Sequence, residues 1–185
     1  MRSNLDKKKT EQVLLVRQLK DNTKSLRTLK LLNSNQCEAR SLFQKAATLT
    51  QLHIESHVNS IVNMTLKAIF DNPYEFTIRF VSRRNVTEAD LLLIRDEIEF
   101  SPLDAVGGGV VDILSIALRI AYWSMEENTR AVIFWDEPTR NCSINLHSSI
   151  SAMFKMMCEE LQMQFIIVSH QQNMINSADK VFNIE

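Results

Sequence analysis

The sequence predicts a mixed α/β protein in which a long N-terminal helix leads into a small domain of strands and helices. Residues 10–69 contain neither Gly nor Pro and repeat apolar residues at steps of three and four, the period of an α-helix. Residues 131–135 and 165–168 are short, wholly apolar runs on either side of a helical stretch, which is typical of parallel strands. With 185 residues, 45% of them hydrophobic, the chain can build one real core.

The first helix is expected to form a helical arm over residues 1–70, followed by a domain over residues 71–185. About 60 residues of continuous helix would be roughly 90 Å long, more than this domain can cover, so we expect a second helix to pack along it as a coiled coil. The apolar repeat is interrupted by Asn22, Asn33, Gln36 and Arg40, so no strict heptad is kept. One irregular helix and two helices joined at residues 33–35 both remain open.

Pro73 ends this helix, because proline disfavours helical geometry in the residue before it and cannot donate a backbone hydrogen bond. Apolar and polar residues then alternate over 76–81, and a second apolar run covers 91–94, which predicts an antiparallel pair of strands. A helix is expected over residues 111–123 and another over 145–161. The wholly apolar strands at 131–135 and 165–168 predict a parallel sheet buried on both faces, and Val181 and Phe182 are candidates for a last strand.

The composition excludes several classes of protein. No run of about 18 apolar residues exists and no apolar stretch follows the basic N-terminus, so we expect no membrane span, no signal peptide and a cytoplasmic protein. Cys37, Cys142 and Cys158 lack the spacing of a disulfide framework or a zinc site. The net charge is −1, but residues 1–30 hold nine Lys or Arg against three acidic residues. This segment either contacts the phosphates of DNA or forms a solvated helix face.

Two carboxylates, Asp136 and Glu137, directly follow the apolar run at residues 131–135. In open α/β folds, ligands bind at the carboxyl ends of the strands. Asp136 could hold Mg²⁺ there, directly or through water, while Glu137 could orient and deprotonate an attacking water. His170 ends the second apolar strand, 33 residues after Glu137. If the two strands are neighbours, its imidazole lies beside the acids and could hydrogen-bond a terminal phosphate.

All the glycines of the sequence lie together, at Gly107, Gly108 and Gly109. At the start of a helix they let backbone N–H groups and the helix dipole come close to an anion. Because there are no others, no G-x-x-x-x-G-K-[ST] phosphate-binding loop can be written anywhere in the sequence. Residues for one half of an ATP site are present, and those for the other half are missing.

Taken in order, the segments AVGGGVVDILSIALRIAYW, AVIFWDEPTRNCS and FIIVSH resemble the C-terminal half of an ABC-type ATPase head of the structural-maintenance-of-chromosomes (SMC) class. The resemblance covers residues 58–185 and is closest to the DNA-repair and recombination ATPases of phages and bacteria. In that family an N-terminal half carries the P-loop, a coiled coil runs out and returns, and the C-terminal half completes the P-loop ATPase head. The resemblance implies that this chain begins on the returning helix.

The resemblance also implies roles for individual residues. Residues 106–109 would form the signature loop, which reaches ATP on the opposite head of a dimer, and residues 141–143 would lie in the D-loop. Asp136 and Glu137 would be the Walker B pair and His170 the switch histidine. The implied cofactor-binding residues are Val106, Gly107, Gly108, Gly109, Asn141, Cys142 and Ser143. Two features depart from the family, because Val106 replaces a phosphate-contacting serine and the segment TRNCSINL lacks the usual Asp of the D-loop.

The leading hypothesis is therefore the C-terminal lobe of an SMC-like DNA-repair or recombination ATPase, which hydrolyses ATP with Mg²⁺ only when a P-loop half is supplied. Its expected partners are that half, a second head and DNA. The alternative is a non-catalytic module that docks on a complete ATPase and regulates it. A remnant without function is the weakest hypothesis, because nothing structural requires Asp136, Glu137 and His170 together.

Overall fold

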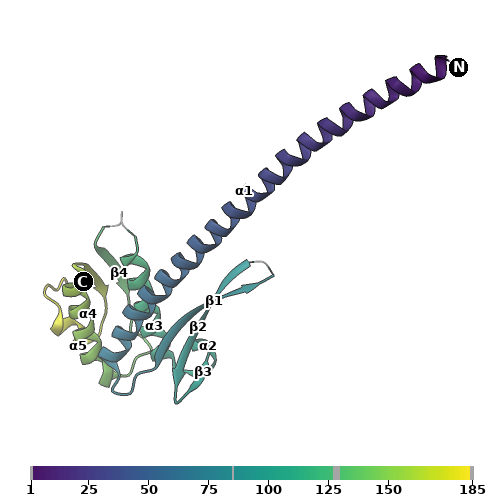
Figure 1. Ribbon diagram of the computed structural model, residues 1–185. Coiled ribbons are helices and arrows are strands. Elements are labelled where there is room, and N and C mark those ends of the chain that lie inside the picture. The colour runs from purple at the N-terminus through teal and green to yellow at the C-terminus, as the bar shows by residue number, and fades with distance from the viewer. Residues whose placement is uncertain (1, 85, 127–129, 184–185) are drawn as a thin grey trace. The chain divides into compact units, whose positions relative to one another are not determined.

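A computed structural model describes residues 2–84, 86–126 and 130–183 (Figure 1). Helix α1 runs from Arg2 to Ile69 without a break, so the alternative of two helices joined at residues 33–35 is wrong. The structure divides into two compact units, residues 1–50 and residues 51–185, and the second unit includes the last part of α1. None of the described helices combines the length and the apolar character that a membrane span requires.

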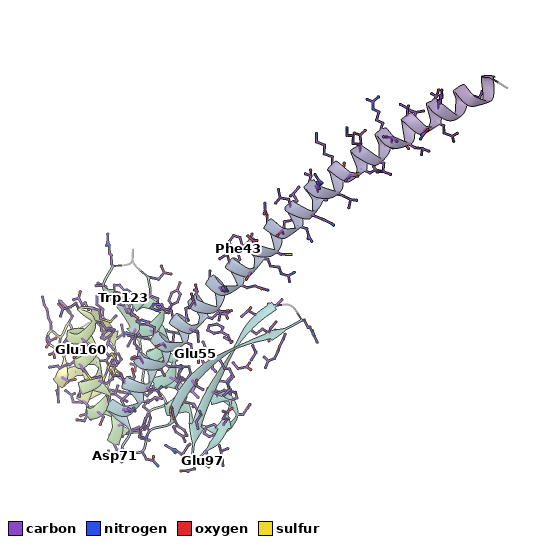
Figure 2. All side chains as sticks on the ribbon, in the orientation of Figure 1. Phe43, Glu55, Asp71, Glu97, Trp123 and Glu160 are labelled. Atoms are coloured by element: carbon purple, nitrogen blue, oxygen red, sulfur yellow. The ribbon has the colours of Figure 1, made fainter. Side chains whose placement is uncertain are left out.

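The described residues of the first unit are all helical, and the apolar side chains described there are exposed. Figure 2 shows the side chain of Phe43 projecting from the helix into solvent. The other large exposed apolar residues of this unit are Val13, Leu14, Leu15, Val16, Leu19, Leu26, Leu29, Leu31, Leu32, Leu42 and Leu49. Soluble proteins rarely leave so much apolar surface open, and large exposed patches usually mark sites of interaction.

The second unit begins with the end of α1, which packs against an antiparallel sheet. Strand β1 (Glu75–Arg83) pairs along its whole length with β2 (Val86–Arg95), which confirms the predicted antiparallel pair. A short third strand, β3 (Ile98–Phe100), pairs with residues 93–95 of β2. The buried apolar residues that α1 and this sheet contribute to the core are Val58, Ile61, Val62, Leu66, Ile69, Phe76, Ile78 and Leu93.

A run of helices and parallel strands completes the second unit. Helix α2 (Pro102–Ala105) leads to α3 (Gly108–Ser124), which starts within the three glycines as predicted and buries one face in the core. Strand β4 (Val132–Asp136) is followed by a single 3₁₀ turn, η1 (Ile144–Leu146), by α4 (His147–Leu161) and by β5 (Gln164–Val168). Strands β4 and β5 are parallel neighbours, as the sequence predicts, and α5 (Gln172–Ser177) follows them.

The prediction that both faces of the parallel sheet are buried is wrong. On one face, Trp135 and Phe165 pack with Phe154 of α4, with ring centroids 5.1–6.4 Å apart. On the other face, Phe134 is 72% exposed, and Ile166 and Val168 are exposed as well. Only two strands pair here, and no described residue covers their second face. The wholly apolar sequence makes these strands fit for burial on both sides, but this chain covers one side.

The predicted last strand at Val181 and Phe182 is also wrong. Residues 181–183 are in no strand, and both apolar side chains are exposed. Two apolar residues in a row do not fix a strand unless a neighbouring strand edge is there to pair with them.

Candidate functional site

The parallel register of β4 and β5 brings their carboxyl ends together. Asp136 lies opposite Val168, and the ladder continues one residue further, because the Glu137 N–H donates to the carbonyl oxygen of Val168 at 3.0 Å. His170 therefore lies beside the two acids. The condition on which its predicted position depended, that the two strands are neighbours, is met.

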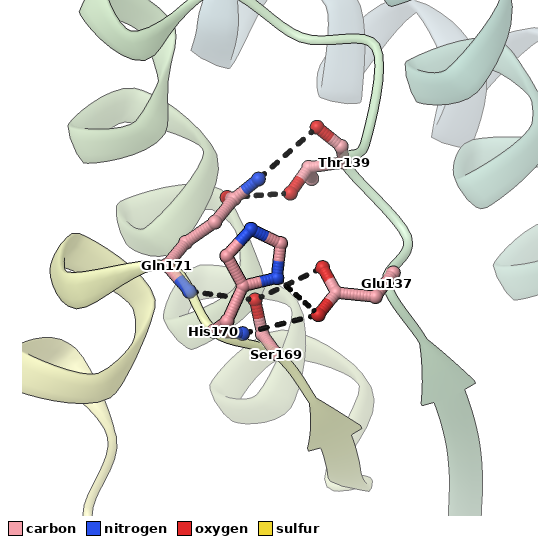
Figure 3. Close-up of polar contacts among 5 residues, drawn as sticks. All are labelled: Glu137, Thr139, Ser169, His170 and Gln171. Carbon is pink, nitrogen blue, oxygen red and sulfur yellow. Dashed lines mark hydrogen bonds and ion pairs between the residues drawn. The ribbon is translucent and has the colours of Figure 1, made fainter.

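Glu137 is the centre of the contacts at this edge (Figure 3). Its carboxylate oxygen Oε1 lies 2.7 Å from Nδ1 of His170 and accepts the backbone N–H of His170 at 3.1 Å. The hydroxyl of Ser169 donates to Oε2 at 3.5 Å. The backbone of Glu137 has φ = 43°, in the left-handed region that non-glycine residues rarely adopt. Such strained residues cluster at functional sites, where the surrounding contacts hold them in place.

A second pair of contacts ties the same two loops together behind Glu137. Thr139 is fully buried, and its hydroxyl donates to the side-chain oxygen of Gln171 at 2.9 Å. The side-chain nitrogen of Gln171 lies 3.5 Å from the carbonyl oxygen of Thr139, and the Gln171 N–H donates to the hydroxyl of Ser169 at 3.2 Å. The loops that follow β4 and β5 are thus fixed to each other at both Glu137 and Thr139.

Asp136 ends β4 with an exposed side chain. No group of three or more His, Cys, Asp or Glu suited to a metal ion occurs among the described residues. Mg²⁺ sites in nucleotide enzymes commonly use one or two carboxylates, with waters and phosphate oxygens as the remaining ligands. A single exposed carboxylate such as Asp136 fits that kind of site and does not fit an all-protein metal cage.

The glycine residues at the start of α3 pack against the loop that follows β4. A Cβ atom on Gly109 would lie 3.1 Å from the carbonyl oxygen of Asn141 and 3.3 Å from Cα of Cys142. A Cβ atom on Gly108 would lie 3.3 Å from Cβ of Asn141, whereas one on Gly107 would meet nothing within 4 Å. Gly108 and Gly109 therefore allow a close approach of two backbones, and Gly107 remains open.

Asp112 binds the start of α3 to the loop that follows β4. Its carboxylate accepts the backbone N–H of Asn141 at 2.9 Å and the side-chain amide of Asn141 at 3.2 Å. The neighbouring Cys142 thiol contacts the carbonyl oxygen of Gly109 at 3.6 Å. Burial, with a smaller contribution from the charge of Asp112, raises the pKa of this thiol to about 11. A buried, protonated thiol is a packing group here and not a nucleophile.

The structure thus gathers the predicted site residues into two groups. Glu137 and His170 are in direct contact, with Asp136 at the end of the same strand. Gly108 and Gly109 pack against Asn141 and Cys142. The other predicted residues lie beside this second group in sequence: Val106 is half-buried, Gly107 is the residue before α3, and the carbonyl oxygen of Ser143 accepts the Leu146 N–H at 2.9 Å.

Four residues that shape the site were not predicted as site residues. Asp112, Thr139, Ser169 and Gln171 hold the loops through contacts that join positions far apart in the sequence. Asp112 and Asn141 are separated by 29 positions, and Thr139 and Gln171 by 32. The only signal in the sequence is that Ser169 and Gln171 flank His170 and that Thr139 follows the Asp-Glu-Pro run.

Comparison with solved structures gives the same fold class. An SMC ATPase studied for ATP-driven dimerization and DNA-stimulated activation superimposes with a TM-score of 0.57 and 12% identity, over 75% of this chain and 81% of that chain. An Smc head bound to the C-winged helix domain of ScpA gives a TM-score of 0.50 and 12% identity, over 68% of this chain and 36% of that one. The Smc head domain of Pyrococcus furiosus, with an extended coiled coil and bound to the C-terminal domain of ScpA, gives 0.50 and 14%, over 71% and 31%.

These similarities define the fold, which is that of the C-terminal lobe of an SMC head domain with its adjoining helix. The predicted fold class and the resemblance to SMC heads are confirmed. The chain spans only about a third of the two Smc heads seen with ScpA domains. The sequence matches no known protein-family model and no curated protein.

Proposed function

We propose that this chain supplies one half of the ATP-hydrolysing site of an SMC-like DNA-repair or recombination ATPase. The observation that carries the proposal is the contact of 2.7 Å between Glu137 and His170, made where two neighbouring parallel strands end. The similarity of the fold to that of an SMC ATPase supports the proposal. The P-loop must come from residues outside this sequence.

In the proposed reaction, Glu137 orients the attacking water and accepts its proton, and His170 positions Glu137. The second ring nitrogen of His170, on a side chain that is 83% exposed, is then available to hydrogen-bond a phosphate oxygen. Asp136 would hold the metal ion. Bound ATP would supply the phosphoryl group, and Mg²⁺ would neutralise the charge of the phosphates.

The start of α3 is the proposed signature loop, which acts on ATP held by a second head. Gly107 has open space around it, so its backbone is accessible to an anion, and α3 directs its N-terminal dipole at the same point. Val106 brings no hydroxyl group to this loop. The backbone N–H groups at the helix start are therefore the proposed phosphate donors.

The exposed face of the parallel sheet supports the need for a P-loop lobe. Parallel sheets are almost always covered on both faces, but Phe134, Ile166 and Val168 leave one face of β4 and β5 open. A lobe that packs on this face would cover its exposed apolar residues. It would also bring the missing phosphate-binding loop to the edge where Glu137 and His170 lie. The exposed apolar residues of α1 are the proposed contact for a second coiled-coil helix, and the basic residues 1–30 are the proposed contact for DNA.

ATP hydrolysis by the purified chain, alone and co-expressed with a P-loop half of an SMC-like ATPase, tests this proposal. We expect activity only in the combined preparation, and a loss of about 100-fold or more in Glu137→Gln, because proton transfer to a positioned base contributes on that scale. The matched control is Glu160→Gln, an exposed glutamate on α4, which should leave the rate unchanged. A stable complex with the P-loop protein that hydrolyses no ATP would contradict the proposal.

Two observations favour a second function, a regulatory module that binds a complete ATPase without turning over ATP. The loop at Asn141 is fastened to α3 by Asp112, and Val106 offers no hydroxyl group to a nucleotide. The test is to add the chain to a complete ATPase and measure its rate of ATP hydrolysis. A change in that rate that is the same for the original chain and for Glu137→Gln would support this second function.

A further inference from the structure

The two edges of the antiparallel sheet differ in what covers them. The outer edge of β1 is covered by α1, because Asn63 accepts the Phe76 N–H at 2.7 Å and donates to the Phe76 carbonyl oxygen at 2.8 Å. Asn59, one turn earlier, accepts the Ile78 N–H at 2.9 Å. On the other side, β3 pairs only with residues 93–95 of β2. Residues 86–92 of β2 therefore have a neighbouring strand on one side only.

This open edge of β2, residues 86–92, presents backbone donors and acceptors without partners. In an antiparallel pair, alternate residues direct their N–H and C=O groups away from the neighbouring strand. Within the described part of the chain, no hydrogen bond reaches these groups from the open side. Helix α2 contacts β2, but no strand pairs with residues 86–92 on this side. At about 3.3 Å per residue, these residues span roughly 20 Å, enough for a strand of ordinary length. Native proteins usually protect such edges, because they are templates for pairing with another chain.

An apolar groove of about 700 Å³ lies along this edge. Residues 89–92 of β2 form one wall, and Leu114, Leu118 and Tyr122 of α3 form the other. Leu103 of α2 lies at its end and is 81% exposed, and Tyr122 is 68% exposed. A strand added to β2 would turn every second side chain into this groove, which is the way extended peptides obtain both affinity and specificity.

The charges of the groove select the kind of occupant. Asp90 is the only carboxylate in its lining, and Arg83 binds it at 2.7 Å and lowers its pKa. Arg119 also lines the groove; it lies over the ring of Trp135 at 5.5 Å and takes part in none of the ion pairs of the described residues. The groove thus has an unpaired cation, while its own anion is already neutralised.

We propose that the open edge of β2 binds an extended segment of a partner protein, which joins the sheet as a fourth strand, places alternate apolar side chains in the groove and pairs a carboxylate with Arg119. A second copy of this chain fits less well, because the carboxylates that its own β2 would bring, Glu88 and Asp90, are both bound to Arg83. The proposal does not depend on ATP hydrolysis and stands or falls separately from it.

The test uses the full chain and two displayed libraries of nine-residue peptides. Both libraries have Val, Ile or Thr at alternate positions, and they differ in carrying either Glu or Lys at one intervening position. We expect selected Glu peptides to bind about threefold to fivefold more tightly than their Lys counterparts, the scale of one exposed ion pair. Bound peptide should also slow amide hydrogen exchange at the open edge of β2, because its backbone pairs there.

Three variants and one matched control sharpen this test. Leu103→Glu and Tyr122→Glu should each weaken binding of the Glu peptides by about tenfold or more, since they place a charge in the apolar groove. Arg119→Glu should reverse the preference, so that the Lys peptides bind better. The control is Ile144→Glu, which changes an equally exposed apolar residue, 75% exposed, outside the groove and should have no effect.

Three results would overturn the proposal. The first is that no member of either library binds the chain. The second is binding that Leu103→Glu and Arg119→Glu leave unchanged, which would place the peptide elsewhere. The third is a dimer of the chain in analytical ultracentrifugation that Leu103→Glu dissociates, which would make a second copy the occupant. Since the three substituted side chains are solvent-exposed, thermal unfolding followed by circular dichroism should show that the variants fold.

Discussion

Gly109 is required by the loop beside it and not by its own backbone angles. No described glycine has a positive φ, but a Cβ atom at Gly109 would lie 3.1–3.3 Å from backbone atoms of Asn141 and Cys142. Asp112 holds that loop, so it cannot easily move away. We expect Gly109→Ala to lower the free energy of unfolding by about 1–2 kcal/mol, as overpacking does, when measured by urea denaturation.

Gly107→Ala is the matched control for this prediction. Its Cβ atom would meet nothing within 4 Å, and its φ of −67° suits any residue. Replacing glycine by alanine at the residue before a helix slightly weakens the start of the helix. It also lowers the conformational entropy of the unfolded chain, and the two effects on stability offset each other. We expect a change of less than about 0.5 kcal/mol. Equal effects at Gly107 and Gly109 would contradict the close packing of α3 on the loop.

Cys142 gives a second prediction, about pH. Burial first, and then the charge of Asp112, raise the pKa of its thiol from an ordinary 9.0 to about 11. Between these values the unfolded chain has lost the proton that the folded chain keeps, so this contribution to stability falls as the pH rises from 9 towards 11. At pH 8 the folded thiol is protonated and buried, and it should resist iodoacetamide.

Cys37 is the internal control for this labelling, because it is exposed on α1. Mass spectrometry after a short reaction at pH 8 should find Cys37 alkylated and Cys142 unmodified, and urea should make both react. Alkylation of Cys142 at the rate of Cys37 in the folded chain would contradict the burial of the loop against Gly109.

The positions of single site residues could be predicted only near the end of a strand. Asp136, Glu137 and His170 were predicted to lie together because each lies within two residues of the end of an apolar run, and neighbouring parallel strands bring such positions to one edge. The bond between Asp112 and Asn141 was not predictable, because nothing in the local sequence says which loop the first turn of α3 will touch. Contacts of this kind are decided by the tertiary fold.

At the scale of elements, the pattern of apolar residues predicted which strands form, but it did not predict which residues cover their faces. The alternating segment predicted β1, and the apolar runs predicted β2, β4 and β5. An apolar strand shows that burial on both faces is favourable, but it does not show whether the covering residues belong to the same chain. Phe134, Ile166 and Val168 are exposed for this reason.

Phe134 provides the prediction at this scale. Because its side chain is 72% exposed, Phe134→Glu should leave the stability of the isolated chain within about 0.5 kcal/mol of the original. If a P-loop lobe packs on the open face of β4 and β5, the same change should abolish co-purification of that lobe, since it would bury an unpaired charge. Ile144→Glu, an equally exposed apolar position outside the sheet, should retain the lobe. Co-purification that survives Phe134→Glu would place the lobe elsewhere.

At the scale of the whole chain, the two compact units differ in how their helix is stabilised. Residues 51–69 of α1 bury five apolar side chains in the core of the second unit: Val58, Ile61, Val62, Leu66 and Ile69. The described side chains of residues 7–50 are all exposed, so that part of the helix buries no side chain in a core. Helices without tertiary packing are marginal in water, and their free energy of opening is small.

Limited proteolysis tests this difference. Trypsin should cut first at the Lys and Arg residues between Lys7 and Lys45, and it should leave a resistant fragment that starts at Ala46, because cleavage follows the population of the opened state. Arg95 and Arg119 are the internal controls, since both lie in the packed unit. Early cleavage at these two sites would contradict the difference in stability. If a second helix packs on the exposed apolar residues of α1, adding the P-loop protein should protect Lys20 and Lys30 but leave cleavage of an unrelated helical peptide unchanged, which separates binding from inhibition of the protease.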